Sequence, residues 1–155
     1  MKVSSDRPGI FAPPPLIYLL PFGAGLWLQH RLPLPMALGR LAHWLGWSLV
    51  GISCLGFALA LAALWRAGTS VNPYRASSAV AAAGIYRFTR NPVYLADALL
   101  YVGAALVLKD LWSLLLLPLA LVAVQKGVIT REEAYLERKF GEEYRQYKAR
   151  VRRWL

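Results

Sequence analysis

The chain has 155 residues, of which 57% are hydrophobic and only 17% are charged. Soluble domains usually hold about 45–50% apolar and about 25% charged residues, so this composition favours a membrane protein. The net charge is +10, but nucleic-acid binding would need a basic face on a soluble fold, and we expect no nucleic-acid partner. His30 and His43 have no carboxylate or thiol at ligand spacing, so we also expect no metal.

Two uncharged segments come first in the chain. The first is expected to form a membrane-spanning helix over about residues 15–30, with a late start because Pro13 and Pro14 precede it. The second, residues 41–65, has 25 residues without a charge. It is long enough for about 37 Å of helix, against a hydrocarbon core of about 30 Å. The beginning of the chain has no small-residue cleavage pattern, so we expect no secretory signal.

Two further apolar segments follow a polar connector, residues 66–91. They cover about residues 92–108 and 111–129, and only Lys109 and Asp110 separate them. So short a connection predicts a tight antiparallel hairpin of two spans. The complete prediction is an all-α membrane protein, with four transmembrane helices in a single domain.

The C-terminal segment, residues 131–154, combines charged residues with apolar ones at helical spacing. Six apolar residues recur at intervals of three or four and would form one stripe: Leu136, Phe140, Tyr144, Tyr147, Val151 and Trp154. Gly141 weakens such a helix but does not have to end it. We therefore expect one amphipathic helix on the membrane interface, with its arginines near anionic lipid head groups.

Lysine and arginine are distributed unevenly along the chain. Two precede the first span, four lie in the connector and nine follow from Lys126 onward, whereas Arg31, Arg40 and Lys109 lie on the opposite side. By the positive-inside rule, the connector and both termini should be cytoplasmic. The short chain and its minimal loops favour a bacterial inner-membrane protein.

Three polar features meet on the expected cytoplasmic side. The connector ends in an arginine-rich stretch in which Pro92 suits the first turn of a helix and leaves its amides available to a ligand. Asp97 follows within the third span, where an acid is a functional candidate, although a helix N-terminus also favours an acid. Glu132 and Glu133 lie where the fourth span ends, and they could bind an ammonium group or pair with neighbouring basic residues.

Two sequences, GIYRFTRNPVYL (84–95) and REEAYLERKFGEEYRQYKARV (131–151), together resemble the isoprenylcysteine carboxyl methyltransferase superfamily. That superfamily includes phospholipid N-methyltransferases and many short bacterial proteins. The likeness runs from about residue 66 to the C-terminus. It implies an integral-membrane methyltransferase that uses S-adenosylmethionine, bound in a cytoplasm-facing pocket, to modify a lipophilic acceptor.

The resemblance also implies roles for individual residues. The cofactor site would be lined by Val80, Tyr86, Asn91, Pro92, Val93 and Tyr94. Glu132 would take the methionine ammonium, with Glu133 beside it. Beyond the resemblance, the chemistry of methyl transfer suggests that Arg90 orients the acceptor or the cofactor. Contacts to the acceptor would come from a set of charged residues: Arg87, Asp97, Lys126 and Arg131.

Three positions depart from the family pattern. Asn91 stands where many relatives have histidine, which excludes a role that needs imidazole. Ala96 replaces a glycine, and its methyl group is expected to narrow the pocket. Val128 stands where the prenylcysteine enzymes have an arginine that grips the substrate carboxylate, so carboxylate, thiol and amine acceptors all stay open.

Two alternatives to a methyltransferase also stay open. Sterol and enone reductases resemble this family in their C-terminal half, so one alternative is a membrane reductase that uses NADPH. The other is a non-enzymatic membrane scaffold whose basic tail binds anionic lipid. Thermal stabilisation by NADPH would favour the reductase, and lipid binding with a steep salt dependence would favour the scaffold.

Overall fold

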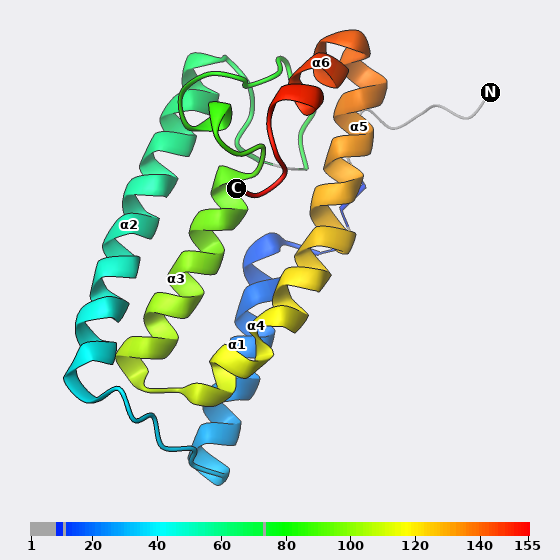
Figure 1. Ribbon diagram of the computed structural model, residues 1–155. Helices are drawn as coiled ribbons and strands as arrows, with labels where there is room; N and C mark the ends of the chain where they lie inside the picture. Colours follow the sequence, from blue (N-terminus) through cyan, green and yellow to red (C-terminus); the bar gives the residue numbers. More distant parts are fainter. Residues whose placement is uncertain (1–8, 11, 73) are drawn as a thin grey trace.

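The computed structural model describes residues 9–10, 12–72 and 74–155, and Figure 1 shows that they fold mainly into helices. The helical elements are α1 (Pro14–Arg31), α2 (Gly39–Arg66), the 3₁₀ turn η1 (Gly84–Arg87), α3 (Pro92–Leu108), α4 (Leu111–Val124), the π-helical turn η2 (Gln125–Ile129), α5 (Thr130–Phe140) and α6 (Glu142–Arg150). No strand occurs in these described ranges. The prediction of an all-α fold is confirmed.

The helices run alternately down and up the molecule (Figure 1). Helix α1 descends, α2 rises, α3 descends, and α4 rises and continues through η2 into α5. The main packing partners are α2 with α3 and α1 with α4. The connector, α6 and the C-terminus gather at the upper end of this view, and the α3–α4 turn lies at the lower end. The fold therefore brings the start of α3 and the end of the chain to the same end of the bundle.

Within the described part of the chain, two helical rods are long and apolar enough to cross a membrane. Helix α2 has 28 residues, and the rod made by α4, η2 and α5 has 30. Only 11% of the most apolar part of α2 is buried, whereas the core helix of a soluble protein is mostly buried. Helices α1 and α3 have 18 and 17 residues, close to the roughly 20 that a span needs. Four membrane crossings stay a prediction.

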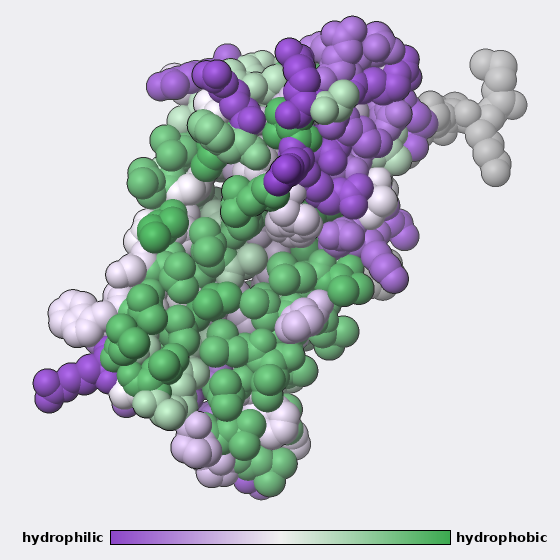
Figure 2. All heavy atoms as spheres, viewed as in Figure 1, coloured by the Kyte–Doolittle hydropathy of each residue, from purple (hydrophilic) through white to green (hydrophobic). Residues whose placement is uncertain are grey.

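Apolar and polar surfaces are separated along the long axis of the molecule. Figure 2 shows hydrophobic residues over the lower part of one face and hydrophilic residues gathered at the upper end, over α5 and α6. The exposed apolar side chains of α2 include Trp44, Trp47 and Trp65, the last of them 82% exposed. An exposed apolar surface of this kind, with tryptophans near both ends, suits contact with a bilayer.

Helices α2 and α3 cross at two glycines. A Cβ atom on Gly46 would lie 2.7 Å from the carbonyl oxygen of Gly103, and a Cβ atom on Gly103 would lie 2.8 Å from that of Gly46. Only glycine permits so close an approach of two helix backbones. Further along the same pair, the Ser53 hydroxyl of α2 donates to the Ala96 carbonyl oxygen of α3 at 2.7 Å.

The turn between α3 and α4 has the expected two residues. Lys109 adopts left-handed backbone with a φ of 56°, and the Asp110 carboxylate caps α4 by accepting a hydrogen bond from the Ser113 backbone N–H at 3.2 Å. Beyond this turn the two helices diverge (Figure 1). The short connection is present, but each helix packs mainly against a different partner.

The C-terminal segment is not the single interfacial helix expected over residues 131–154. Helix α5 continues the rod of α4, ends at Gly141, and is followed by α6, which turns back over the upper end. Gly141 has a φ of 54° and a ψ of −120°, a conformation that favours glycine and breaks the helix. The prediction was wrong because the glycine was treated only as a weak helix former.

Part of the apolar stripe expected along this segment faces protein. Tyr144 and Tyr147 of α6 are only 2% and 5% exposed, and Leu136 of α5 lines the same internal cavity as both tyrosines. Because these three side chains are used for internal packing, the described tail helps to close one end of the bundle.

Candidate active site

A cavity of about 250 Å³ lies where the connector, α3, α5 and α6 meet. This volume is slightly below the roughly 300–1,000 Å³ typical of small-molecule sites. Helices α1 and α2 also contribute to its walls, through Pro14 and Phe57 among others. The start of α3 and the acid pair of α5 therefore enclose one cavity, as the sequence predicted.

The structure brings together every residue expected at the cofactor site. The cavity is lined by Val80, Tyr86, Asn91, Pro92, Val93, Tyr94, Glu132 and Glu133, and also by Arg90 and Asp97. These residues come from the connector and from two helices that are not adjacent in sequence. Their convergence is a property of the fold, while the role of each stays a prediction.

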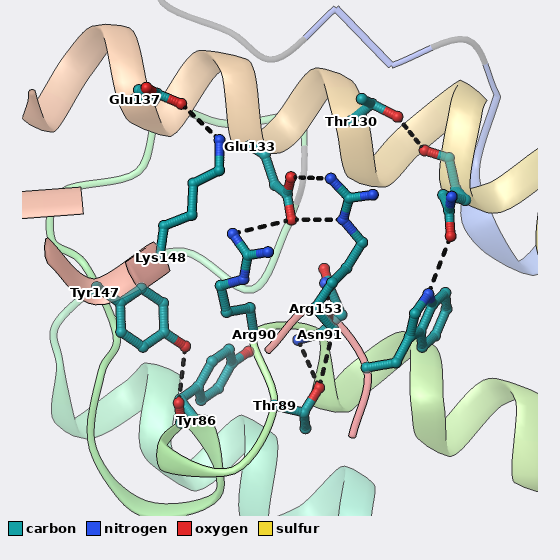
Figure 3. A network of polar contacts seen from close by, with 12 residues as sticks. Tyr86, Thr89, Arg90, Asn91, Thr130, Glu133, Glu137, Tyr147, Lys148 and Arg153 are labelled. Atoms are coloured by element: carbon teal, nitrogen blue, oxygen red, sulfur yellow. Dashed lines mark hydrogen bonds and ion pairs between the residues drawn. The ribbon is translucent and has the colours of Figure 1, made fainter. Parts of the chain in front are cut away.

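The two neighbouring carboxylates of α5 have different partners. Glu133, whose side chain is 7% exposed, accepts hydrogen bonds from Arg153 Nε at 3.0 Å and Nη2 at 2.7 Å (Figure 3). Glu132 accepts one from the Tyr94 hydroxyl at 2.8 Å and forms no ion pair within the described residues. No group of three metal-ligating residues occurs in the described ranges. Of these two neighbouring carboxylates, Glu132 is thus the one available to a cationic ligand group.

Arg90 presents a buried cationic group to the cavity. Its side chain is 9% exposed, and its Nη1 lies 3.4 Å from Glu133 Oε1 (Figure 3). This distance allows charge attraction, yet neither Nε nor Nη1 has a hydrogen-bond partner among the described residues. A buried donor without an acceptor costs about 1–3 kcal/mol, and an anionic ligand would remove that cost. Arg90 is therefore suited to bind a carboxylate.

Aromatic side chains surround these charges. Tyr86 lies on η1, which begins at Gly84 with a φ of 62°. The Tyr147 hydroxyl donates to the Tyr86 carbonyl oxygen at 2.8 Å (Figure 3). Burial raises the pKa of Tyr86, as does the nearby charge of Glu132, and burial also raises the pKa of Tyr147. Both hydroxyls therefore stay neutral at physiological pH, and the rings offer apolar and π surface to a ligand.

The last five residues, 151–155, form an extended segment that we call the C-terminal strap. Its Arg153 carbonyl oxygen accepts hydrogen bonds from Thr89 Oγ1 at 3.1 Å and from Asn91 Nδ2 at 2.9 Å. Both donors lie just before α3. The Asn91 side chain, at the position of the family histidine, therefore holds the strap.

Three of the four residues expected to contact the acceptor lie outside the cavity. Arg87 is exposed on η1, and Arg131 is exposed with its Nη1 donating to the Gly9 carbonyl oxygen at 2.8 Å. Lys126 lines a separate apolar groove between α3 and α4, together with Leu95, Ala98, Leu121, Val122, Gln125 and Trp154. Asp97 alone of the four lines the cavity, and acceptor contacts by the others stay a prediction.

The structure shows where two of the residues that depart from the family pattern, Ala96 and Val128, are packed. Ala96 is 2% exposed and lies against α2, where a Cβ atom on Gly56 would be 3.6 Å from its methyl group. The expectation that Ala96 narrows the pocket is therefore wrong, because its side chain packs between helices. Val128 is fully buried in an apolar core with Tyr18 and Val124.

Sequence reasoning missed the part of the cavity wall made by the first two helices and by α6. These residues are Pro14, Pro15, Phe57, Leu64, Tyr144 and Tyr147. For α6 a signal was present, since tyrosines on an apolar stripe have hydroxyl groups that need partners when they are buried. The two prolines of α1 and the residues Phe57 and Leu64 of α2 have no comparable signal.

The cavity thus combines two carboxylates without a basic partner among the described residues, Glu132 and Asp97, one arginine with unsatisfied donors, and several tyrosines in an apolar wall. Carboxylates and arginines form their strongest hydrogen bonds with groups of opposite charge. Such a set is complementary to a zwitterionic ligand that has both an ammonium and a carboxylate. A further cationic centre in the ligand would be accommodated by the faces of the tyrosine rings.

Comparison with known proteins agrees with the sequence resemblance. Protein-S-isoprenylcysteine O-methyltransferase of Schizosaccharomyces pombe is 35% identical over 109 residues, which are 67% of this chain and 46% of that protein. An uncharacterized protein of Haemophilus influenzae is 57% identical over 35 residues, which are 23% of this chain and 56% of that protein. The chain therefore spans about half the length of the curated relatives it matches. No solved structure matches it.

The family model described as phospholipid methyltransferase matches residues 41–143. This range includes α2, η1, α3, the rod from α4 to α5, and most of the residues that line the cavity. Because the match covers well over half of the sequence, the chain belongs to the phospholipid methyltransferase family.

Proposed function

We propose that the chain is an integral-membrane, S-adenosylmethionine-dependent methyltransferase that acts on a lipophilic or lipid-like acceptor. One observation carries the proposal: a carboxylate without an ion-pair partner and an arginine with two unsatisfied donors line the same cavity. Membership in a methyltransferase family and the exposed apolar surface of α2 support it.

Four side chains would hold the methyl donor in this proposal. Glu132 would accept hydrogen bonds from the methionine ammonium, and the Nε and Nη1 atoms of Arg90 would donate to the methionine carboxylate. The rings of Tyr86 and Tyr94 would offer their faces to the sulfonium. The fit is favourable because the ammonium and the carboxylate each meet a group of opposite charge, and the cationic sulfonium meets the faces of neutral aromatic rings.

When bound, S-adenosylmethionine supplies an electrophilic methyl group. The residues of this chain then have to align the acceptor and exclude water. Apolar side chains such as Phe57, Leu64 and Val71 line the cavity and are suited to the second task. Asp97, the remaining acid of the wall, would attract a protonated acceptor or take the proton that an amine or thiol releases.

The acceptor would reach the cavity from the bilayer. The groove between α3 and α4, lined by Leu95, Ala98, Leu121 and Val122, offers apolar surface for a lipid chain, and Lys126 at the same groove could contact an anionic head group. We propose that both termini are cytoplasmic, on the basis of the lysine and arginine distribution, and, on the basis of the minimal loops, that the helices lie in a bacterial inner membrane.

Isothermal titration with S-adenosylhomocysteine in detergent tests the proposal. The wild-type protein should bind, and E132Q should bind at least roughly tenfold more weakly, because a hydrogen bond to a charged group contributes about 1.5–3 kcal/mol. The matched control is E143Q, which changes an exposed acid of α6 and should leave the affinity unchanged. Equal affinity of E132Q and wild type would remove Glu132 from the site.

The same protein preparation distinguishes the alternatives. Thermal stabilisation by NADPH, with none by S-adenosylhomocysteine, would replace the proposal with a membrane reductase. If neither ligand binds and vesicles of anionic lipid bind with a steep salt dependence, the protein is a membrane scaffold.

A further inference from the structure

Two arginines face one buried carboxylate at the edge of the cavity (Figure 3). Arg153 donates two hydrogen bonds to Glu133, at 3.0 Å and 2.7 Å, whereas Arg90 Nη1 approaches the same carboxylate only to 3.4 Å. These hydrogen bonds with Glu133 also raise the pKa of Arg153. One carboxylate balances one of the two positive charges, so the other is left without a carboxylate of its own.

The arginine left with unsatisfied donors is the more buried of the two. The Arg90 side chain is 9% exposed and that of Arg153 is 32% exposed. Solvent can reach Arg153, but the Nε and Nη1 atoms of Arg90 have neither solvent nor a hydrogen-bond acceptor in the described chain. Without Arg153, the Glu133 carboxylate, already within 3.4 Å, would be free to accept hydrogen bonds from Arg90.

The strap holds Arg153 in this place through its backbone. The Arg90 N–H donates to the Arg152 carbonyl oxygen at 3.0 Å, and Thr89 and Asn91 both donate to the Arg153 carbonyl oxygen. Three successive residues before α3 are therefore tied to the strap. The backbone hydrogen bonds fix the position of the Arg153 main chain, and the Glu133 carboxylate binds the guanidinium of its side chain.

We propose that Arg153 is a positioning residue: by occupying Glu133 it keeps the donors of Arg90 available for the carboxylate of the bound ligand. The proposal rests on the function proposed above, which makes that ligand S-adenosylmethionine. It assigns Glu133 to the architecture of the site and leaves Glu132 as the acid that contacts the ligand. It also gives the C-terminal strap a role in ligand affinity that is separate from closing the bundle.

The test compares two ligands in titration calorimetry with full-length protein in detergent. S-adenosylhomocysteine has the carboxylate, and its decarboxylated analogue lacks only that group. In R153Q, Glu133 loses its partner and should draw Arg90 to itself. The affinity for S-adenosylhomocysteine should then fall roughly tenfold or more, the effect of losing a charged hydrogen bond, while the affinity for the analogue should change less than about twofold.

A matched control and a rescue separate this mechanism from simple loosening of the strap. R152Q removes the same charge from the neighbouring, exposed position and should bind both ligands as the wild type does. In E133Q/R153Q the carboxylate that competes for Arg90 is gone, so affinity for S-adenosylhomocysteine should return to within about threefold of wild type. This double variant leaves no unpaired charge at either position, so it tests the proposal even if R153Q does not fold.

Each outcome decides the question. Equal weakening of both ligands in R153Q would overturn the proposal, and so would a double variant that folds but binds S-adenosylhomocysteine tenfold more weakly than wild type. Wild-type affinity in R153Q would overturn it as well. If the wild-type protein binds neither ligand, the proposed function itself fails, and this result is distinguishable from failure of the Arg153 proposal alone.

Discussion

Replacing Gly46 by alanine should destabilise the helix pair that supports the cavity. The new Cβ atom would lie 2.7 Å from the Gly103 carbonyl oxygen and 2.8 Å from the Val107 backbone nitrogen. Overpacking an interior costs about 1–3 kcal/mol, and the upper end applies here because backbone atoms cannot rotate away. Alanine gains about 1 kcal/mol over glycine in a helix. The net loss of stability is therefore about 2 kcal/mol.

Gly51 provides the matched control within the same helix. Apart from its chain neighbours and the backbone of its own helix, no described heavy atom would lie within 4 Å of a Cβ atom on Gly51. G51A should therefore gain about 1 kcal/mol of stability from helix propensity, without a clash. In a chain of this length, 1 kcal/mol shifts Tm by roughly 2–4 °C. Thermal unfolding in one detergent should show a fall of about 4–8 °C for G46A and a rise of about 2–4 °C for G51A. An unchanged or raised Tm in G46A would refute the close crossing of α2 and α3.

Three further results follow from the backbone and the buried tyrosines. K109G should raise Tm slightly, because glycine removes the cost of a left-handed backbone, about 1–2 kcal/mol, that Lys109 bears at a φ of 56°. G141A should lower Tm by several degrees, since alanine is strained at a φ of 54° and a ψ of −120°. Burial raises the pKa of Tyr86, Tyr144 and Tyr147 in the folded protein. As pH rises, the tyrosine hydroxyls of the unfolded chain therefore lose their protons before those of the folded protein do. The contribution of these groups to stability should be complete below about pH 10 and should fall above it. Tm measured between about pH 8 and pH 11 should show this fall, and Phe at any of the three positions should reduce it.

The boundaries of the apolar helices were predictable because their signals are local. The third span was expected to start at Pro92 and does so, since proline suits the first helical turn. The fourth starts after Asp110, whose side chain caps it. The continuation of that helix through residues 130–140 and its end at Gly141 were not predicted, because they depend on a π-helical turn and on a glycine conformation that the apolar pattern does not reveal.

The motifs predicted which residues of the connector, α3 and α5 line the cavity, but they did not predict the division of tasks among them. The sequence places Glu132 and Glu133 side by side without saying which one is engaged. That difference arises from Arg153, which comes from the end of the chain and meets Glu133 only after α6 has turned back. In the same way, Ala96 lies against α2 because of how two helices pack. Contacts between distant segments decide these points, and spacing along the chain does not encode them.

A crystal structure of the protein with S-adenosylhomocysteine would test the central claim most directly. We predict that the ligand occupies the cavity between the connector and α5, with its ammonium at hydrogen-bond distance from Glu132, its carboxylate on Arg90, and Arg153 still bound to Glu133. A ligand found elsewhere, or an Arg90 side chain that is hydrogen-bonded to Glu133 and makes no contact with the ligand carboxylate, would contradict it.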